Sequence, residues 1–583
     1  MTARLDAWRA ARARALRARD PERAIEDIDR ALRAEIYDAL GQTPRAPSPL
    51  ATALDGIEGD DDARVEAVHL HLLAHPLTDG AAGPTVAHDA KRRKDFGVVY
   101  TPAPLVDALV DEALAPLAHS VSDVLRLRVV DPACGTGAFL VGAYRWLLAR
   151  CAGLPDAPAR ALRCLYGVDL DADALALAAR ALRRASGVTD DLSDRLVRAD
   201  ALSMDWRATF PEALADGGFD AVIGNPPYVS YAGRQSVPLP SARRRELARR
   251  FPAASRWPSA HGFFIELASR EVSRDVVAFV VPDQVAHLER YAPLREALRS
   301  THGLRALKFH GEDAFRGVVT PALSFVASRA HDGATRMTDA RGETVTRALA
   351  RGAPWVPRAP DVLWERLREG AVSIADHVVD RGIRTTDAGR QVVALRDARA
   401  GDLPVLEGAC VRRYRCDPPA RALRLDAGAP SPRVADDARW DEVAFVLRQT
   451  AGHPIVGPRR HVRHFRNSLL GLRATPGGLD LRYLVGLLNS ALMRMIYEAQ
   501  VQESAQRSFP QVKKSYLAAL PIRVPRNAFE RARRDDVIDG VTALLADPSR
   551  ADLDAAVDAA VFALYGVGDD ELARLRSFAP GPR

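Results

Sequence analysis

The chain has 583 residues, of which 47% are hydrophobic and 27% are charged. At roughly 150 residues per domain this length allows about four folded domains, each with its own core. The composition excludes a disordered chain. The formal net charge of +7, from 82 Lys plus Arg and 75 Asp plus Glu, favours an anionic partner but does not identify it.

Residues 1–90 are rich in Ala and Arg and predict amphipathic helices, with an exposed basic first helix and no strand pattern. They lack the apolar stretch and small-residue cleavage site of a secretory signal, and no apolar run in the chain approaches the roughly 18 residues of a membrane span. We therefore expect a cytoplasmic protein. The five cysteines are scattered and never in CxxC spacing, so we expect neither a disulfide framework nor a metal site.

From about residue 91, short β-branched runs alternate with helical segments. Seven of these runs predict strands: LRVVD, LYGVDL, RLVRAD, FDAVIG, VVAFVV, LRALKFH and ALSFVAS. The alternation is typical of an α/β fold with a doubly wound, mainly parallel, Rossmann-like sheet. We expect this sheet domain over 91–335, a linker over 336–370, a mixed α+β domain over 371–527 and a helical tail over 528–583.

The run VVDPACGTGAFLVGAY places Asp131, Gly135 and Gly137 between a strand and a helix, where glycines let the backbone approach a ligand. The next two strands end in Asp169 and Asp200, which suit ribose hydroxyls and an adenine amino group. Asp131 would repel phosphate and attract an ammonium, so S-adenosylmethionine fits better than a dinucleotide. The spacing from Gly137 to Asp169 exceeds the roughly 20 residues of a dinucleotide fingerprint. We expect an extended helix through LPDAPARALRC to accommodate it.

The fourth strand continues into Asn225, Pro226, Pro227 and Tyr228, the most specific motif of the chain. FGVVYTP, DPACGTG, GVDL, RADAL and NPPY follow one another in that order. In these motifs and their order the sequence resembles the gamma-class adenine-N6 DNA methyltransferases, the TaqI-like group, over about residues 91–527. The resemblance implies an enzyme that transfers a methyl group from S-adenosylmethionine to N6 of a flipped-out adenine in duplex DNA.

The resemblance also implies a role for each residue of the motif. The Asn225 side-chain oxygen and the Pro226 carbonyl would accept the two N–H bonds of the target amine, which draws out its lone pair. The two prolines would fix the direction of that carbonyl. Tyr228 would stack on the flipped base, and Phe315, in GEDAFRGVVTPALSFVAS, would lie on the opposite face of the base.

The implied cofactor contacts come from all the motifs. Thr101 would touch the methionine carboxylate, and Asp131 would bind the methionine amino group. The full set is Tyr100, Thr101, Asp131, Ala133, Gly135, Gly137, Asp169, Leu170, Asp200, Ala201 and Asn225.

Two segments carry concentrated positive charge. The Arg-rich, Pro-interrupted stretch from Tyr231 to Ser259 predicts a loop or lid that orders on phosphates, or else a solvated insertion. Residues 451–527 hold 12 Lys plus Arg against three Asp plus Glu, and this region resembles TaqI-like specificity domains, which implies DNA recognition. A genome rich in Arg codons would explain many solvated arginines, but it does not explain clustering. We expect phosphate contacts from Arg459, Arg460, Arg463, Lys513 and Lys514.

Other functions remain open. The first 90 residues show no PD-(D/E)xK nuclease core, so the resemblance implies a separate restriction nuclease or defence-system subunit as a partner. NPPY chemistry also acts on RNA or on a protein glutamine, but those enzymes lack a large basic domain after the sheet. A non-catalytic DNA-binding module is disfavoured because the NPPY motif is intact. We expect no metal and no membrane partner.

Overall fold

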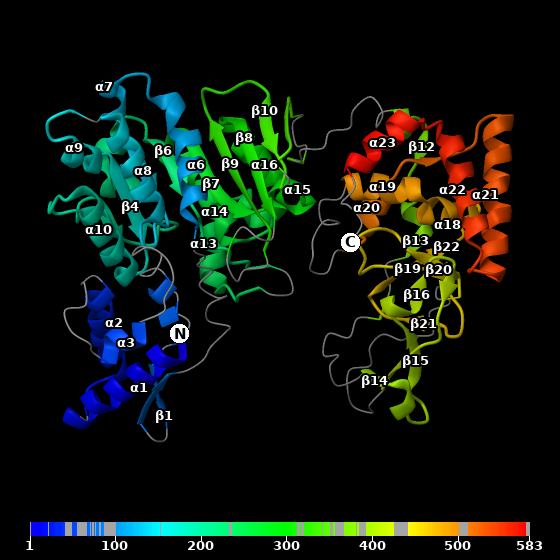
Figure 1. Cartoon of the computed structure of the whole chain (residues 1–583), viewed down its shortest axis with the longest axis horizontal. Helices are drawn as coiled ribbons and strands as arrows, with labels where there is room; N and C mark the ends of the chain where they lie inside the picture. Colours follow the sequence, from blue (N-terminus) through cyan, green and yellow to red (C-terminus); the bar gives the residue numbers. More distant parts are fainter. Residues whose placement is uncertain are drawn as a thin grey trace. The chain divides into compact units, whose positions relative to one another are not determined.

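The computed structural model describes residues 2–20, 22–40, 49–54, 67–69, 71–72, 75, 77–80, 83–86, 101–151, 153–232, 236–311, 315, 320–340, 342–349, 354–355, 366–379, 382–383, 392–424, 441–500 and 511–578. The chain forms two compact units, Met1–Pro357 and Arg358–Arg583 (Figure 1). In the described part of the chain, no helix is both long and apolar enough to cross a membrane.

A nine-stranded sheet is the centre of the first unit. Its strands are β3 (Val129–Asp131), β4 (Leu165–Asp169), β5 (Leu196–Arg198), β6 (Phe219–Gly224), β7 (Ser273–Pro282), β8 (Gly303–Gly311), β9 (Ala322–Ser328), β10 (Thr335–Thr338) and β11 (Thr344–Arg347). They lie in the order β11-β10-β8-β9-β7-β6-β3-β4-β5. The strands from β7 to β5 are mutually parallel, whereas β9 is antiparallel to both of its neighbours. The predicted doubly wound, mainly parallel sheet is confirmed, and all seven predicted strands are present.

Helices cover both faces of this sheet (Figure 1). They are α6 (Ala103–Leu114), α7 (Val121–Val124), α8 (Ala138–Arg150), α9 (Ala157–Arg163), α10 (Ala172–Ser186), α11 (Trp206–Thr209), α12 (Pro211–Ala215), α13 (Ser241–Arg250), α14 (Ala260–Leu267), α15 (Gln284–His287) and α16 (Ala292–Thr301). Successive strand residues point to opposite faces. Ala221 and Ile223 of β6 therefore join a core with α6, α8, α9 and α10, while Val222 joins a second core with α13, α14 and α16.

The N-terminal residues pack onto α10 in the same unit. They form α1 (Thr2–Arg19), α2 (Ile25–Leu40), α3 (Pro49–Leu54) and a hairpin of β1 (Leu77–Gly80) and β2 (Gly83–Val86). The sequence predicted helices alone, because a hairpin this short carries almost no alternating pattern. The first helix is also less exposed than expected: Arg9 is fully buried and pairs with Asp6 and Asp29.

Two further expectations about this unit differ from the structure. Strands β10 and β11 lie largely within the expected linker 336–370, where they form a hairpin that extends the sheet beside β8. The helix expected through LPDAPARALRC is not continuous, because α8 ends at Arg150 and α9 begins separately at Ala157. Gly153 and Asp156 between them have positive φ angles of 91° and 58°, which a helix cannot contain.

The second unit combines small sheets with helices. Its strands are β12 (Ala371–Val372), β13 (Val378–Val379), β14 (Val392–Ala394), β15 (Leu403–Leu406), β16 (Val411–Arg412), β17 (Arg415–Cys416), β18 (Arg421–Leu423), β19 (Val443–Arg448), β20 (Val456–Pro458), β21 (His464–Phe465), β22 (Leu469–Arg473) and β23 (Ile522–Arg523). Its described helices are α18 (Leu481–Asn489), α19 (Ala491–Gln500), α20 (Lys514–Ala518), α21 (Ala528–Ala546), α22 (Ala551–Tyr565) and α23 (Asp569–Phe578). Helices α21 and α22, expected as a tail, share one core with α18 and α19.

Candidate active site

The carboxyl ends of four neighbouring parallel strands carry the predicted site residues. Asp131 ends β3, Asp169 ends β4, Asp200 follows β5 and Asn225 follows β6. Strands β3 and β6 are neighbours although the chain continues from them in opposite directions across the sheet. Ligands bind at such a topological switch point in doubly wound sheets. The fold therefore gathers the acids and the NPPY motif along one edge.

Asp169 is fixed by two backbone donors. The Gly135 N–H donates to its Oδ2 (2.8 Å) and the Asp171 N–H donates to its Oδ1 (2.9 Å), so one carboxylate joins the glycine turn to the end of β4. Gly135 and Gly137 have positive φ angles of 51° and 92°, conformations that favour glycine. A Cβ at Gly137 would also lie 3.0 Å from the Ala178 side chain of α10. Burial raises the pKa of the Asp169 carboxyl.

Asp131 lies directly against the end of β6. Its carboxyl is buried, and its Oδ1 accepts the Ala133 N–H (3.0 Å). A Cβ at Gly224 would lie 2.5 Å from the same oxygen, so the glycine before Asn225 is what lets the carboxyl approach β6. Burial raises the pKa of Asp131 to about 8. A cationic group bound beside it would restore the charged form.

In the Asn225 side-chain amide, the nitrogen is hydrogen-bonded and the oxygen is not. Its Nδ2 donates to the Thr101 hydroxyl (2.9 Å), which comes from the segment just before α6. Its Oδ1 is buried, and among the described residues it has no hydrogen-bond partner. Thr101, expected on the cofactor carboxylate, is thus the group that orients the amide. The site holds a buried hydrogen-bond acceptor at the position the NPPY motif predicts, and such atoms are normally paired.

Tyr228 and Phe315 come together, but not in the expected arrangement. Their ring centroids are 6.1 Å apart and the rings are inclined at 82°, so the contact is edge to face. A base stacked between two rings requires both to be parallel to it. The two rings are therefore nearly perpendicular and not parallel, and Phe315 is almost fully buried.

The start of α14 supports the NPPY loop, which the sequence did not reveal. Ser230 and Ser259 form an antiparallel bridge, and the Ala260 N–H donates to the Val229 carbonyl (2.8 Å). The buried His261 packs edge to face against Tyr228 and shares a 2.9 Å hydrogen bond with the Tyr291 hydroxyl. Burial lowers the pKa of His261 to about 3, so it is neutral.

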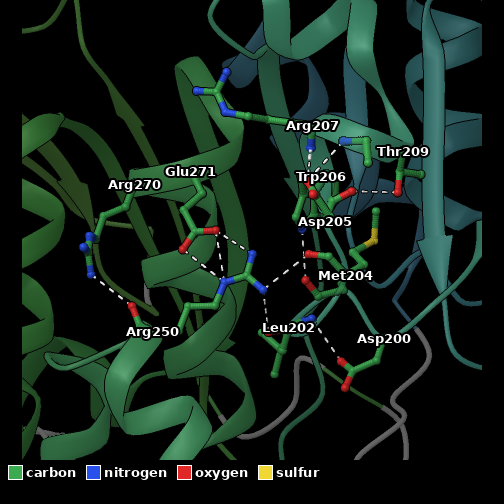
Figure 2. Close-up of polar contacts among 12 residues, drawn as sticks. Asp200, Leu202, Met204, Asp205, Trp206, Arg207, Thr209, Arg250, Arg270 and Glu271 are labelled. Atoms are coloured by element: carbon green, nitrogen blue, oxygen red, sulfur yellow. Dashed lines mark hydrogen bonds and ion pairs between the residues drawn. The ribbon is translucent and has the colours of Figure 1, made fainter.

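The loop that carries Asp200 is held by α13. Asp200 pairs with Arg243 and accepts the Leu202 N–H (3.0 Å) through its other oxygen. Figure 2 shows the second attachment: the Arg250 guanidinium faces Glu271 and also donates to the carbonyls of Leu202 (3.0 Å) and Met204 (3.3 Å). The Arg-rich segment predicted as a loop or a solvated insertion therefore contains an anchored helix.

The remaining cofactor candidates differ in position. Leu170 is 68% exposed beside Asp169, whereas Ala201 is buried beside Asp200. Ala133 lies in the turn after Asp131 and donates to it. Tyr100 lies outside the described residues. In the part of the chain that the structure describes, no group of three or more His, Cys, Asp or Glu side chains is arranged to hold a metal ion.

The basic residues expected to contact DNA all have partners within the second unit. The Arg459 guanidinium donates to three backbone carbonyls, at 2.6, 3.4 and 3.4 Å. Arg460 and Lys514 each donate to one carbonyl, at 3.0 and 2.9 Å. Arg463 forms a 2.9 Å ion pair with an aspartate, and the Lys513 ammonium lies 5.2 Å from a tyrosine ring centroid. Part of the clustered charge therefore holds the local fold.

Two protein families match parts of the chain. Residues 163–315 match the Eco57I restriction-modification methylases, and residues 403–522 match the TaqI-like C-terminal specificity domain. The first segment spans the strands from β4 to β8 with the NPPY motif, and the second lies within the second unit. The predicted resemblance to adenine-specific restriction-modification methylases with a C-terminal specificity domain is confirmed.

Individual relatives agree with these matches. The adenine-specific methyltransferase PglX of Streptomyces coelicolor is 28% identical over 231 residues, which are 31% of this chain and 18% of that protein. The chain therefore spans less than a fifth of that relative. The type II methyltransferase M.VspI of a Vibrio species is 21% identical over 54% of this chain and 71% of its own length.

Solved structures share the fold at low sequence identity. The type IIL restriction-modification enzyme MmeI, in complex with DNA, superposes with a TM-score of 0.57 at 14% identity, over 95% of this chain and 90% of that chain. The type ISP restriction-modification enzyme LlaBIII, bound to DNA, gives 0.54 at 11% identity, over 93% of this chain and 49% of that chain.

Proposed function

We propose that this chain, with its methylase segment and its TaqI-like specificity domain, transfers a methyl group from S-adenosylmethionine to N6 of an adenine in duplex DNA. The buried, unpartnered Oδ1 of Asn225 carries this proposal. An exocyclic aromatic amine is a poor nucleophile because its lone pair is delocalised into the ring. A fixed acceptor for its N–H draws the lone pair out towards the methyl group.

The chain supplies the geometry for this step. Thr101 fixes the Asn225 amide so that Oδ1 faces away from it, and the Pro226 carbonyl is the proposed second acceptor. The two prolines restrict the backbone that carries this carbonyl. An acceptor already in place costs no reorganisation when charge develops on the amine.

The residues of the edge fit the cofactor. Asp131 would hold the ammonium, Asp169 the ribose hydroxyls and Asp200 the adenine amino group, with the glycine turn passing close to the ligand. The exposed Leu170 is suited to pack on the adenine ring. When bound, S-adenosylmethionine supplies an electrophilic methyl group. Binding in line with the amine makes the transfer a matter of positioning.

The target base has to leave the duplex to reach this edge, at a cost of a few kcal/mol. Tyr228 is the proposed stacking ring. Its edge contact with Phe315 then has to open, so that one or both rings turn their faces to the base. The neutral His261 and the bridge to Ser259 hold the loop behind Tyr228.

DNA is favoured over RNA or a protein glutamine by the second unit. Residues 403–522 match a specificity domain, and the named relatives are adenine-specific and type II methyltransferases. In this proposal 371–527 recognises the target sequence, and exposed parts of Arg460 and Arg463 reach phosphates. We also propose a role in restriction-modification or phage defence beside a separate nuclease or defence subunit; the match to restriction-modification methylases supports the first of these roles.

Asn225→Ala tests the proposal. With radiolabelled cofactor and duplex oligonucleotides, we expect methyl transfer to fall by about 100-fold or more, the usual effect of removing one transition-state hydrogen-bonding group. Cofactor affinity, measured by calorimetry, should stay near wild type. Asn527→Ala is the matched control, because that amide only caps α21 through the Glu530 N–H (2.8 Å).

The controls also separate the substrates. Transfer to RNA or to a glutamine peptide, but not to duplex DNA, would contradict the proposed substrate. Equal loss of cofactor binding in a folded Asn225→Ala protein would contradict the role of the amide.

A further inference from the structure

Helix α13 has two faces of different character. Arg243, Leu247 and Arg250 follow one another at intervals of four and three residues and point into the unit. The exposed side of the helix carries Arg244, Arg245 and Arg249 instead. These three side chains form no hydrogen bond or ion pair with any residue that the structure describes. The acid of this helix, Glu246, pairs with Arg243 (2.7 Å), so these three cations have no ion-pair partner among the described residues.

The inner face attaches the helix firmly. Leu247, and Phe251 just after the helix, are almost fully buried in the core that also contains Val222 of β6. Arg250 makes a forked contact with Glu271, with a shortest N–O distance of 2.6 Å, and Glu271 lies on a π-helical turn, η3 (Ala268–Val272). Charge-assisted, bidentate pairs of this kind are among the stronger polar contacts.

A second arginine, Arg270, contacts the C-terminal end of α13. The Arg270 side chain donates to the Arg250 carbonyl (3.2 Å; Figure 2). It also pairs with the buried Glu266 (2.9 Å). The outer arginines consequently project from a scaffold with fixed orientation. A ligand that binds them does not have to order the helix first, which removes one cost of binding.

The position of the helix suits a nucleic-acid backbone. It follows the NPPY loop in the chain, and the Val237 N–H donates to the Ser230 carbonyl (2.9 Å) at the start of the connection. Its inner face reaches the Asp200 loop at the carboxyl edge of the sheet. The helix that carries the free arginines is thus attached to the same sheet edge as the proposed target-base site, whereas Arg459 is occupied by carbonyls of its own unit.

We propose that the outer face of α13, formed by Arg244, Arg245 and Arg249, binds phosphates of the duplex DNA that is methylated. This inference rests on the proposed function. It assigns a phosphate-contacting surface to the catalytic unit, in addition to the specificity domain. Arginine suits this task because its guanidinium pairs with phosphate through two parallel N–H bonds.

The experiment removes the three charges together. Arg244→Ala, Arg245→Ala and Arg249→Ala are combined in the full chain, and duplex binding is measured over a series of salt concentrations. Each lost phosphate contact lowers the slope of log K against log[salt] by about 0.9, so the slope should fall by up to about 2.7. Cofactor affinity should not change, because Arg243 and Arg250 remain.

A matched triple variant removes the same charge elsewhere in the unit. Arg126, Arg160 and Arg163 are exposed and lie at the opposite end of the strands, before β3 and β4. Their replacement by Ala should leave the slope near wild type. An unchanged slope in the α13 variant, or an equal fall in the matched variant, would overturn the proposed surface.

The outcome also separates this inference from the proposed function. If the wild-type chain methylates duplex DNA but the α13 variant has an unchanged slope, the proposed surface is wrong and the proposed function stands. If the wild-type chain neither binds nor methylates duplex DNA, both the proposed function and the proposed surface are wrong. An α13-dependent slope on RNA alone would mean that the surface exists but that duplex DNA is the wrong partner, which also overturns the inference.

Discussion

Replacement of Asp169 by Ala tests the cofactor edge most directly, because this carboxylate has two tasks. In the structure it accepts the Gly135 N–H (2.8 Å) and the Asp171 N–H (2.9 Å), and in the proposed complex it also accepts a ribose hydroxyl. Hydrogen bonds to charged groups contribute about 1.5–3 kcal/mol. Loss of the ribose contact should therefore weaken cofactor binding by about 10- to 150-fold.

The same substitution should also lower stability. It removes the acceptor of two backbone N–H groups, and an unsatisfied buried donor costs about 1–3 kcal/mol. Asp169 is only partly buried, so water replaces part of the loss, and we expect the free energy of unfolding to fall by about 1–3 kcal/mol in total. Asp169→Asn keeps one acceptor oxygen and should lie between wild type and Ala in both measurements.

Calorimetry with S-adenosylmethionine and urea unfolding of the same preparations provide the two readouts. If Asp169→Ala lowers stability as expected but leaves cofactor affinity unchanged, the carboxylate is a structural brace of the glycine turn and does not contact the ribose. If neither quantity changes, the hydrogen bonds at Gly135 and Asp171 do not contribute as the geometry indicates.

Two further predictions concern other residues of the chain. Burial raises the pKa of Asp131 to about 8, and a bound ammonium would lower it, so cofactor binding should release a proton. The affinity for the cofactor should therefore increase with pH up to about 8, by at most about tenfold per pH unit. Calorimetry in buffers of different ionisation enthalpy should detect the released proton in the wild type and not in Asp131→Asn. Arg459→Ala should destabilise the second unit, because three carbonyls lose their donor, while the salt dependence of DNA binding stays near wild type. A reduced slope of log K against log[salt], in a protein of unchanged stability, would instead mean that Arg459 contacts phosphate.

The sheet could be predicted from the sequence because its strands are short β-branched runs between helices. Strands β3 to β9 are of this kind, and burial on both faces requires it in β3, β6 and β9. Strands β10 and β11 were not predicted, since TRMT and TVTR mix polar and apolar residues; β11 is the edge strand and β10 is its neighbour. The break between α8 and α9 depends on positive φ angles at Gly153 and Asp156, which the helical composition around them concealed.

The candidate site was predictable where it follows chain order. Asp131, Asp169, Asp200 and Asn225 each lie at or just after the end of a strand, and parallel strands bring their carboxyl ends to one edge. Contacts between distant segments had no such signal. The Thr101 hydroxyl meets the Asn225 amide only because α6 packs against the sheet beside β6.

The arginines of this chain show why clustered charge alone could not locate a DNA surface. An arginine with a carbonyl or a carboxylate within reach stabilises the fold, as Arg459 does in the second unit and Arg250 does on α13. Both belong to Arg-rich stretches of similar appearance in the sequence. What separates them from Arg245 and Arg249 is the direction in which the helix or strand points each side chain. The N–H groups that a guanidinium keeps uncommitted after folding, rather than the number of arginines in the sequence, decide what is available to phosphate. On α13 the helical repeat places committed and uncommitted side chains on opposite faces.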